Sequence, residues 1–271
     1  MIKNFAQIEE SMKGRTDAPT IVLAGASDDA SIKALDEAKA KWGISYLAGD
    51  YSASEAVELI KAGKGSALMK GGIATGELLK AVVCKEKGIG LGTLMSHIAA
   101  FECPKYDRLL FVTDGGMVPA PELEQKAAIL KNALYFLHGL AYEKPNVAAL
   151  AAAEAVNPKQ VDTTDAAALA ERAAAGEFGS CVVEGPISFD LAISEESAAL
   201  KGYASQISGK TDLMLAPNIA TGNVLGKALI YMGGALMAGC ILGAKVPIIL
   251  TSRGASTEEK MLSMALALSV K

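Results

Sequence analysis

The chain has 271 residues, of which 51% are hydrophobic and only 5% aromatic, so it can form one large or two medium domains with aliphatic cores. Its formal net charge is −4 and its basic residues are scattered, which excludes the basic surface of a nucleic-acid-binding protein. No uncharged stretch reaches the ~20 residues of a membrane-spanning helix. The N-terminus lacks the apolar core of a signal peptide, so we expect a cytoplasmic protein without membrane contact.

Short apolar runs alternate with helical segments along the chain. Strands are predicted at 20–24, 44–47, 66–69, 109–113, 147–150, 181–183, 213–215 and 247–250. Helices are predicted at 31–42, from Ser52 onward with a capping box, at 75–87 and at 121–137. The uncharged stretch 228–244 is interpreted as a buried helix. This alternation predicts an α/β fold with mostly parallel sheets built from βαβ units.

The residues that follow the predicted strands indicate a ligand site. They are small or charged, as in Lys70-Gly71-Gly72, Asp114-Gly115-Gly116 and Ser252-Arg253-Gly254. Ligands of open parallel sheets bind beyond the carboxyl ends of the strands. Glycines there let the backbone approach a ligand closely, and the amides of the next helix favour anions. Each turn taken alone is equally well explained as an ordinary tight βα turn.

The segment Thr251-Ser252-Arg253 is the most informative of these turns. It follows the apolar run 247–250 and precedes the last helical segment. Arginine presents a planar fork of donors that suits phosphate or carboxylate, and serine can hydrogen-bond a reacting oxygen. The alternative is a structural turn, with Ser252 near the N-cap of the final helix and Arg253 on the surface.

Several familiar site types are not expected from the sequence. The four cysteines (Cys84, Cys103, Cys181 and Cys240) form no Cys-x-x-Cys pair, and His97 and His138 lack metal-ligand spacing. No Gly-x-Ser-x-Gly elbow, dinucleotide fingerprint or complete phosphate-binding P-loop occurs. We therefore predict no metal and no disulfide framework, and we interpret His97 as a satisfied histidine near a strand.

Five segments together resemble one enzyme family. They are 207–223, 243–247 leading into Thr251-Ser252-Arg253, 68–71, 106–114 and 183–186. In this order they resemble the phosphate acetyl/butyryl transferase family, and three of them its phosphate butyryltransferase branch. The resemblance runs from about Ser66 to the end of the chain, whereas the first sixty residues match only in general texture.

The resemblance implies the activity and the architecture. Members reversibly transfer a short acyl group (butyryl or similar) between coenzyme A and inorganic phosphate, by direct attack in a ternary complex. Coenzyme A is a substrate, and no permanently bound cofactor is implied. The expected fold has two α/β/α sandwich domains with an active cleft between them, and the expected assembly is a homodimer. The expected first domain is discontinuous, 1–131 with 243–271, and the second is 132–242.

The resemblance also implies roles for individual residues. Ser252 would donate to the oxyanion, Arg253 would clamp the phosphate, and Glu259 stands where relatives place an Asp that acts as base. Substrate or phosphate contacts are expected from Lys70, Gly71, Asp114, Asn218, Thr221, Gly222 and Asn223. Two departures stand out, because Glu259 replaces Asp and Val118 replaces a polar residue of many relatives.

Alternatives remain open at this point. The acidic pair Glu258-Glu259 followed by Lys260 also fits a solvated face at a helix start. A non-catalytic homologue that binds acyl-CoA or acyl phosphate is the main alternative function. A dehydrogenase or decarboxylase on a similar two-domain scaffold is a further one.

Overall fold

The computed structural model describes residues 2–13, 15–25, 28–251 and 254–270. Two predicted site residues, Ser252 and Arg253, therefore lie outside the described residues. The chain divides into two compact units. We call Ser96–Leu236, with the N-terminal residues up to Lys3, the central unit, and Asn4–Met95 with Met237–Lys271 the terminal unit.

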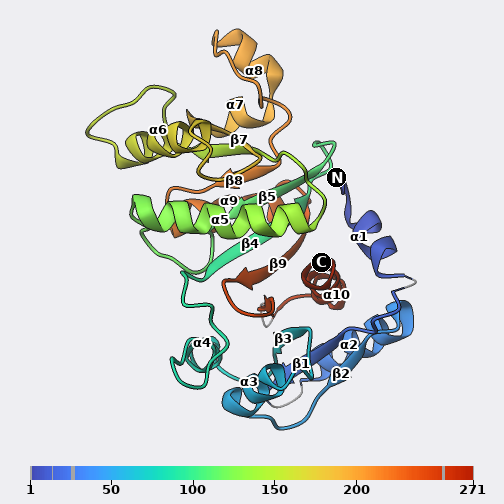
Figure 1. Ribbon diagram of the computed structural model, residues 1–271. Helices are drawn as coiled ribbons and strands as arrows, with labels where there is room; N and C mark the ends of the chain where they lie inside the picture. The colour runs from blue at the N-terminus through green and yellow to red at the C-terminus, as the bar shows by residue number, and fades with distance from the viewer. Residues whose placement is uncertain (1, 14, 26–27, 252–253, 271) are drawn as a thin grey trace. The chain divides into compact units, whose positions relative to one another are not determined.

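The terminal unit is built on a mostly parallel sheet. Its strands run in the order β2 (Ser45–Leu47), β1 (Thr20–Ala24), β3 (Ala67–Lys70), β10 (Ile248–Ile249) and β9 (Leu236–Leu242). Only the β10–β9 pair is antiparallel among the described strands of this unit. The helices are α1 (Phe5–Met12), α2 (Asp29–Trp42), α3 (Ala53–Lys61), α4 (Thr75–Val82) and α10 (Thr257–Leu268). Helix α10 packs against α1 and α2, and α3 packs against α4 and β1 (Figure 1).

Helix starts in this unit follow from local sequence. The predicted capping box at Ser52 is confirmed, because its Oγ accepts from the Glu55 amide while the Glu55 carboxylate accepts from the Ser52 amide. Helix α4 ends at Val82, five residues before the predicted end, in a tight turn closed by the Gly88 amide. A Cβ at Gly88 would lie 2.2 Å from the Val82 carbonyl oxygen, so this turn requires glycine.

In the central unit, too, the sheet is mostly parallel. Its strands run in the order β4 (Ser96–Glu102), β5 (Leu109–Thr113), β8 (Leu213–Leu215), β6 (Asn146–Leu150) and β7 (Val182–Ile187), with only β4–β5 antiparallel among those described. Helices α5 (Leu123–Gly139), α6 (Val161–Ala174) and α9 (Ile219–Tyr231) flank this sheet (Figure 1). The predicted α/β class with mostly parallel strands is confirmed.

The compact units divide at other places than the predicted domains. The predicted boundary between residues 131 and 132 falls inside α5, a continuous helix that packs on β4, β5 and α6. The units divide between Lys3 and Asn4, between Met95 and Ser96 and between Leu236 and Met237, and the predicted domain boundaries stay a prediction.

The stretch 228–244 is not one buried helix, so that prediction is wrong. Helix α9 ends at Tyr231, and β9 begins at Leu236. Gly233 and Gly234 separate them, and Gly234 has a φ of +68°, which glycine adopts without strain. No strand was predicted at β4 either. A short apolar run alone does not show whether it forms a strand or a helix.

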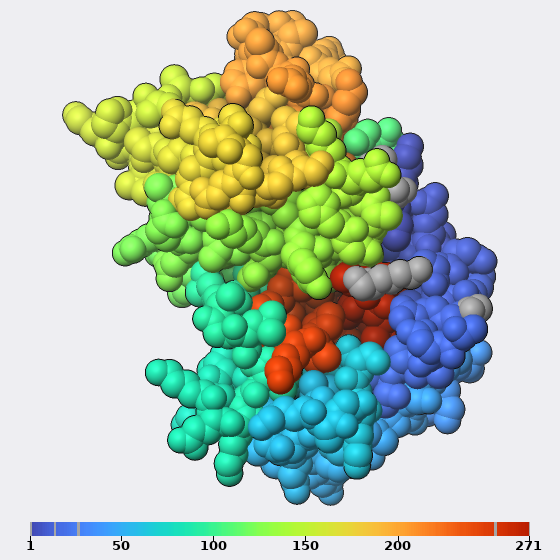
Figure 2. Space-filling view, viewed as in Figure 1, coloured from blue at the N-terminus to red at the C-terminus, as the bar shows by residue number. Residues whose placement is uncertain are grey.

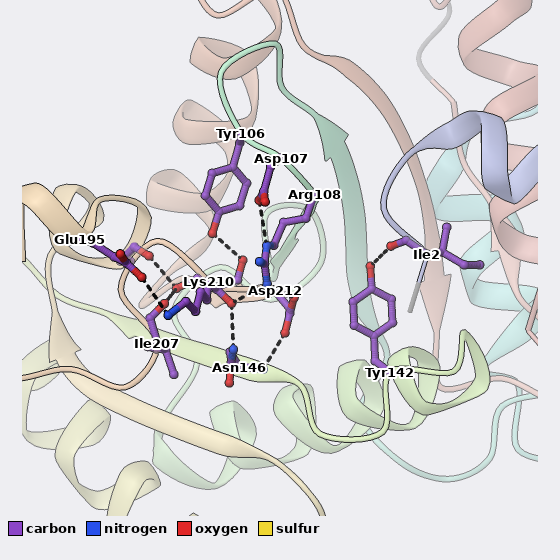
Figure 3. Close-up of polar contacts among 12 residues, drawn as sticks. Ile2, Tyr106, Asp107, Arg108, Tyr142, Asn146, Glu195, Ile207, Lys210 and Asp212 are labelled. Atoms are coloured by element: carbon purple, nitrogen blue, oxygen red, sulfur yellow. Dashed lines mark hydrogen bonds and ion pairs between the residues drawn. The ribbon is translucent and has the colours of Figure 1, made fainter.

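A buried polar cluster lies at the amino ends of three parallel strands of the central unit (Figure 3). Arg108 precedes β5, Asp212 precedes β8 and Asn146 begins β6. The Asp212 carboxylate accepts from the main-chain amide of Asn146 at 2.9 Å and from the Arg108 guanidinium at 3.4 Å. The Tyr106 hydroxyl donates to the Thr211 carbonyl at 2.9 Å. This cluster stands at the strand ends opposite to those where ligands of parallel sheets bind, which marks it as structural.

Two short helices form a projection on the central unit, α7 (Phe189–Ile193) and α8 (Glu195–Leu200) (Figure 2, orange). Lys201, after α8, pairs with Asp190 of α7 at 3.0 Å and with Glu154, which lies outside the projection, at 3.3 Å. Because these ion pairs are exposed to solvent, they contribute little to stability.

Candidate active site

In the terminal unit, the predicted turn residues gather at the carboxyl edge of three neighbouring parallel strands. Lys70 ends β3, and its Nζ donates to the carbonyls of Gly71 at 3.1 Å and Ile73 at 3.3 Å. The Gly71 amide donates to Ala24, the last residue of β1, at 2.8 Å. Thr251 follows β10, which pairs with β3. The structure therefore brings the Lys70-Gly71 turn and the residue before Ser252 to one edge of the sheet.

The start of α10, after Ser252 and Arg253, has a well-defined cap. Helix α10 begins at Thr257, and its N-cap is Ser256, whose Oγ accepts from the Glu259 amide at 3.1 Å. Ser256 therefore satisfies the start of the helix, four residues after Ser252. The alternative that placed Ser252 near the N-cap concerns a residue outside the described ranges and stays open.

Glu259 and Glu258 differ in their surroundings. Glu258 is exposed, whereas Glu259 is partly buried in the first turn of α10. Burial raises the pKa of the Glu259 carboxyl above its ordinary value, against the opposing effects of the Lys260 charge and the Ser256 amide. A carboxylate with a raised pKa accepts a proton more readily near neutral pH. The role of Glu259 as a base stays a prediction, and its partial burial in the first turn of α10 is compatible with it.

Lys260 is not on a solvated face, so that interpretation is wrong for this residue. Its side chain is 4% exposed, and its Nζ donates to the Thr251 hydroxyl at 3.2 Å. The burial of Lys260 could not be predicted from the pattern Glu-Glu-Lys. Its contact with Thr251 joins residues nine apart and depends on the packing of α10.

In the central unit, Asp114 organises the turn after β5. Its carboxylate, 2% exposed, accepts from the amides of Gly116 at 2.7 Å, Met117 at 2.9 Å and Val118 at 3.1 Å. These amides are thereby already bound to an anion of the protein. Asp114 therefore holds its own turn in place, and its contact with substrate or phosphate stays a prediction.

The first turn of α9 packs on the Asp114 turn. A Cβ at Gly222 would lie 2.8 Å from the Gly115 Cα and 2.9 Å from the Asp114 carbonyl oxygen, so only glycine fits there. Asn223 Nδ2 donates to the Gly115 carbonyl at 3.3 Å. The structure thus brings Asp114, Gly222 and Asn223 together.

Asn218 and Thr221 form the cap of α9. The Asn218 Oδ1 accepts from the Thr221 amide at 2.9 Å and from the Thr221 hydroxyl at 3.1 Å. They also line a cavity of about 450 Å³ at the carboxyl ends of β6 and β8, with mostly apolar walls that include Leu150, Phe189 and Leu225. Lys126 also lines it, and its Nζ is paired with Asp165 at 2.7 Å. Sequence reasoning did not identify Lys126.

His97 differs from its predicted state. Its Nδ1 is buried and has no hydrogen-bond partner among the described residues, although the residue was interpreted as satisfied. Burial lowers the pKa of the imidazole, with the Asp114 charge acting in the opposite direction. The ring packs against Gly116, where a Cβ would lie 3.1 Å from its Cγ. A neutral imidazole therefore supports the Asp114 turn from β4.

Three further observations concern the rest of the surface. A larger groove of about 690 Å³ is lined by residues of α3 and α4, and no predicted site residue that the structure describes lines it. Among the residues that the structure describes, no three His, Cys, Asp or Glu side chains are placed to hold a metal ion. Within those same ranges, every helix is too short or too polar to cross a bilayer.

Comparisons with known proteins agree with this arrangement. Residues 48–268 match the family described as Phosphate acetyl/butaryl transferase. Phosphate butyryltransferase of Clostridium acetobutylicum is 38% identical over 98% of both chains, and phosphate acetyltransferase of Thermotoga maritima is 39% identical over 78% of this chain and 72% of its own. A crystal structure of a branched-chain phosphotransacylase from Enterococcus faecalis superposes with a TM-score of 0.83 at 32% identity, covering 93% of this chain and 98% of that one. The chain is therefore an acyltransferase of the phosphate acetyl/butyryl transferase family.

Proposed function

We propose that this protein reversibly transfers a short acyl group, butyryl or similar, between coenzyme A and inorganic phosphate. The observation that carries the proposal is the match to a phosphate butyryltransferase over 98% of both chains. Neither a non-catalytic binding protein nor a dehydrogenase is favoured by these matches. A homodimer in the cytoplasm is part of the same proposal, and light scattering of the purified protein tests the dimer.

The reaction assigns a task to each side chain. In one direction a phosphate oxygen attacks the thioester carbonyl, the carbon–sulfur bond breaks, and coenzyme A leaves as its thiolate. Negative charge grows on the carbonyl oxygen, where Ser252 would donate a hydrogen bond. Arg253 would hold the phosphate with two parallel donors, which also keeps both reactants in register. No covalent acyl-enzyme is needed.

The other site residues contribute by position and charge. Lys70, at the carboxyl end of β3, would add positive charge for the phosphate. Asp114, Gly222 and Asn223 would fix the turn after β5 against α9, as their mutual contacts indicate. Asn218 and Thr221 would shape one wall of the 450 Å³ cavity.

Thiol release tests the function directly. Acetyl-, propionyl-, butyryl- and isobutyryl-CoA are each incubated with the protein, with and without phosphate. We expect free coenzyme A from butyryl-CoA only when phosphate is present. Release without phosphate would indicate a thioesterase. No release from any of the four would favour a non-catalytic acyl-CoA-binding protein.

Glu259→Gln tests the base in the direction from acyl phosphate and coenzyme A. The variant should turn over more slowly at neutral pH, because Gln cannot accept the thiol proton. In the wild type, activity should fall as pH drops through the raised pKa of Glu259, since only the ionised carboxylate is a base. The defect should shrink as pH approaches the thiol pKa, because free thiolate needs no base.

The matched control for this experiment is Glu258→Gln, which removes the exposed neighbour on the same helix turn. It should keep the wild-type pH–rate profile. If Glu259→Gln also follows the wild-type profile at every pH, Glu259 is not the base.

A further inference from the structure

Helix α9 packs on the central unit through glycines. It contacts β4 and β5, and the buried residues of the helix are Gly222 and Gly226 alone. A Cβ at Gly226 would lie 3.0 Å from Cζ of Phe101, and one at Gly222 would lie 2.8 Å from the Gly115 Cα. The helix therefore approaches the strands closely at these two positions, while none of its larger side chains is buried.

The side of α9 away from these glycines is an apolar surface. At about 100° per residue, Val224, Leu225, Ala228, Tyr231 and Met232 lie on one side of the helix and its C-cap. We call these five residues the α9 stripe. Val224 is 66% exposed, Tyr231 85% and Met232 90%. In the same unit, α5 instead buries most of its apolar side chains.

The composition of the α9 stripe indicates the kind of partner that covers it. A helix that is apolar on nearly every side is normally buried, and contiguous apolar patches on a surface mark interaction sites. The stripe carries no charge, and Lys227 is the one cation of α9. A helix that lies on a membrane presents several lysines or arginines, and one of 13 residues is too short to span a bilayer. Exposed tyrosine and methionine without charges are typical of the centre of a protein–protein interface.

A second copy of this chain fits this surface in charge and in size. Two copies each carry a formal net charge of −4, so they avoid repulsion by meeting at a neutral patch. A stable dimer buries roughly 800 Å² on each partner. One exposed tyrosine side chain brings about 150–250 Å², so Tyr231 with the rest of the stripe supplies a large share of that area.

The stripe is also complementary to itself. In an antiparallel pair of α9 helices with a twofold axis at Ala228, Val224 would face Met232 of the second copy, and Leu225 would face its Tyr231. The small side chain of Ala228 would meet its own copy at the axis, which allows the two helices to approach closely.

We propose that the α9 stripe is the centre of a homodimer interface, in which two copies of α9 pack antiparallel across a twofold axis near Ala228. The inference rests on the homodimer of the proposed function and names the surface that forms it. The interface also joins assembly to the candidate site, because the first turn of the same helix holds the Asp114 turn through Gly222 and Asn223.

Tyr231→Lys tests the surface by sedimentation velocity over a range of protein concentrations. The wild type should sediment as a dimer. Tyr231→Lys should raise the dimer Kd at least about 100-fold, because the twofold axis places the new charge at two positions of the apolar centre. Tyr135→Lys is the matched control, since Tyr135 is 77% exposed but lies on α5, outside the stripe. It should leave the dimer Kd within about twofold.

Ala228→Cys tests the same geometry without adding a charge. It is made together with Cys84→Ser, because Cys84 is an exposed thiol. Oxidised glutathione should join two copies through the introduced thiols, since facing Cα atoms of closely packed helices come within the roughly 4.4–6.8 Å that a disulfide spans. Peptide mapping identifies the link. Tyr135→Cys in the same background should form no such link.

The outcomes separate this inference from the proposed function. If the wild type is a monomer at every concentration, the dimer and the interface both fail, while thiol release still decides the acyl transfer. If the wild type is a dimer and Tyr231→Lys weakens it no more than Tyr135→Lys does, the interface lies elsewhere and the inference is overturned. Should Tyr231→Lys fail to fold, the Ala228→Cys link decides, and its absence would overturn the inference.

Discussion

Replacing Ser252 with alanine should lower turnover by roughly ten- to a thousand-fold, the range for removing one donor to a developing oxyanion. The KM values for acyl-CoA and phosphate should remain near those of the wild type. The reason is that the proposed hydrogen bond strengthens only as charge grows on the carbonyl oxygen, so its loss affects the transition state and not the bound substrates. Steady-state kinetics with butyryl-CoA and phosphate measures both quantities.

Ser256→Ala provides the control, since Ser256 caps α10 only four residues farther along. Loss of this cap should cost about 1 kcal/mol of stability and leave turnover nearly unchanged. A Ser252→Ala variant with wild-type turnover would remove Ser252 from the reaction. A large rise in either KM at unchanged turnover would instead assign it to substrate binding.

Asp212→Ala should produce the largest loss of stability in the central unit. The variant removes the carboxylate that accepts from the Asn146 main-chain amide and from the buried side of the Arg108 guanidinium, which keeps only its contacts with Asp107 and the Lys210 carbonyl (Figure 3). Breaking a buried charged pair typically costs about 3–5 kcal/mol. Chemical denaturation should show this loss, while turnover per folded molecule stays unchanged because the cluster lies at the strand ends away from the proposed site.

Asp107→Ala removes the exposed ion-pair partner of the same arginine, Arg108. Asp107 contacts Arg108 at 3.1 Å, but its side chain is 71% exposed. Water can replace an exposed partner, so this variant should lose no more than about 1 kcal/mol. If Asp107→Ala proved as destabilising as Asp212→Ala, burial would not be what makes the cluster important.

Much of the fold could be predicted because local sequence determined it. The strands at Leu109–Thr113 and Leu213–Leu215 are short apolar runs with polar boundaries, and both were predicted with these bounds. The Ser52 capping box also depends on residues only three apart. Strand β9 could not be distinguished from a helix from the sequence. Leu236–Leu242 contains only apolar residues and glycine, so it shows no alternation of apolar and polar positions.

The site residues stay predictions, and they come from turn composition and from the family resemblance. Turn composition after each strand identified Lys70 and Asp114, and the family resemblance pointed to Ser252 and Arg253. The sequence could not reveal that the Asp114 carboxylate accepts hydrogen bonds from the amides of its own turn, because these contacts depend on how the backbone runs there. It also missed the burial of Lys260, which follows from how α10 packs in the terminal unit.

The central claim, acyl transfer between coenzyme A and phosphate, is tested most directly by product stoichiometry. The protein is incubated with butyryl-CoA and phosphate, free thiol is quantified, and acyl phosphate is measured in the same sample as its hydroxamate. The account predicts one acyl phosphate for each coenzyme A released, and the reverse reaction when acyl phosphate and coenzyme A are supplied. Release of coenzyme A together with free butyrate, without acyl phosphate, would contradict it.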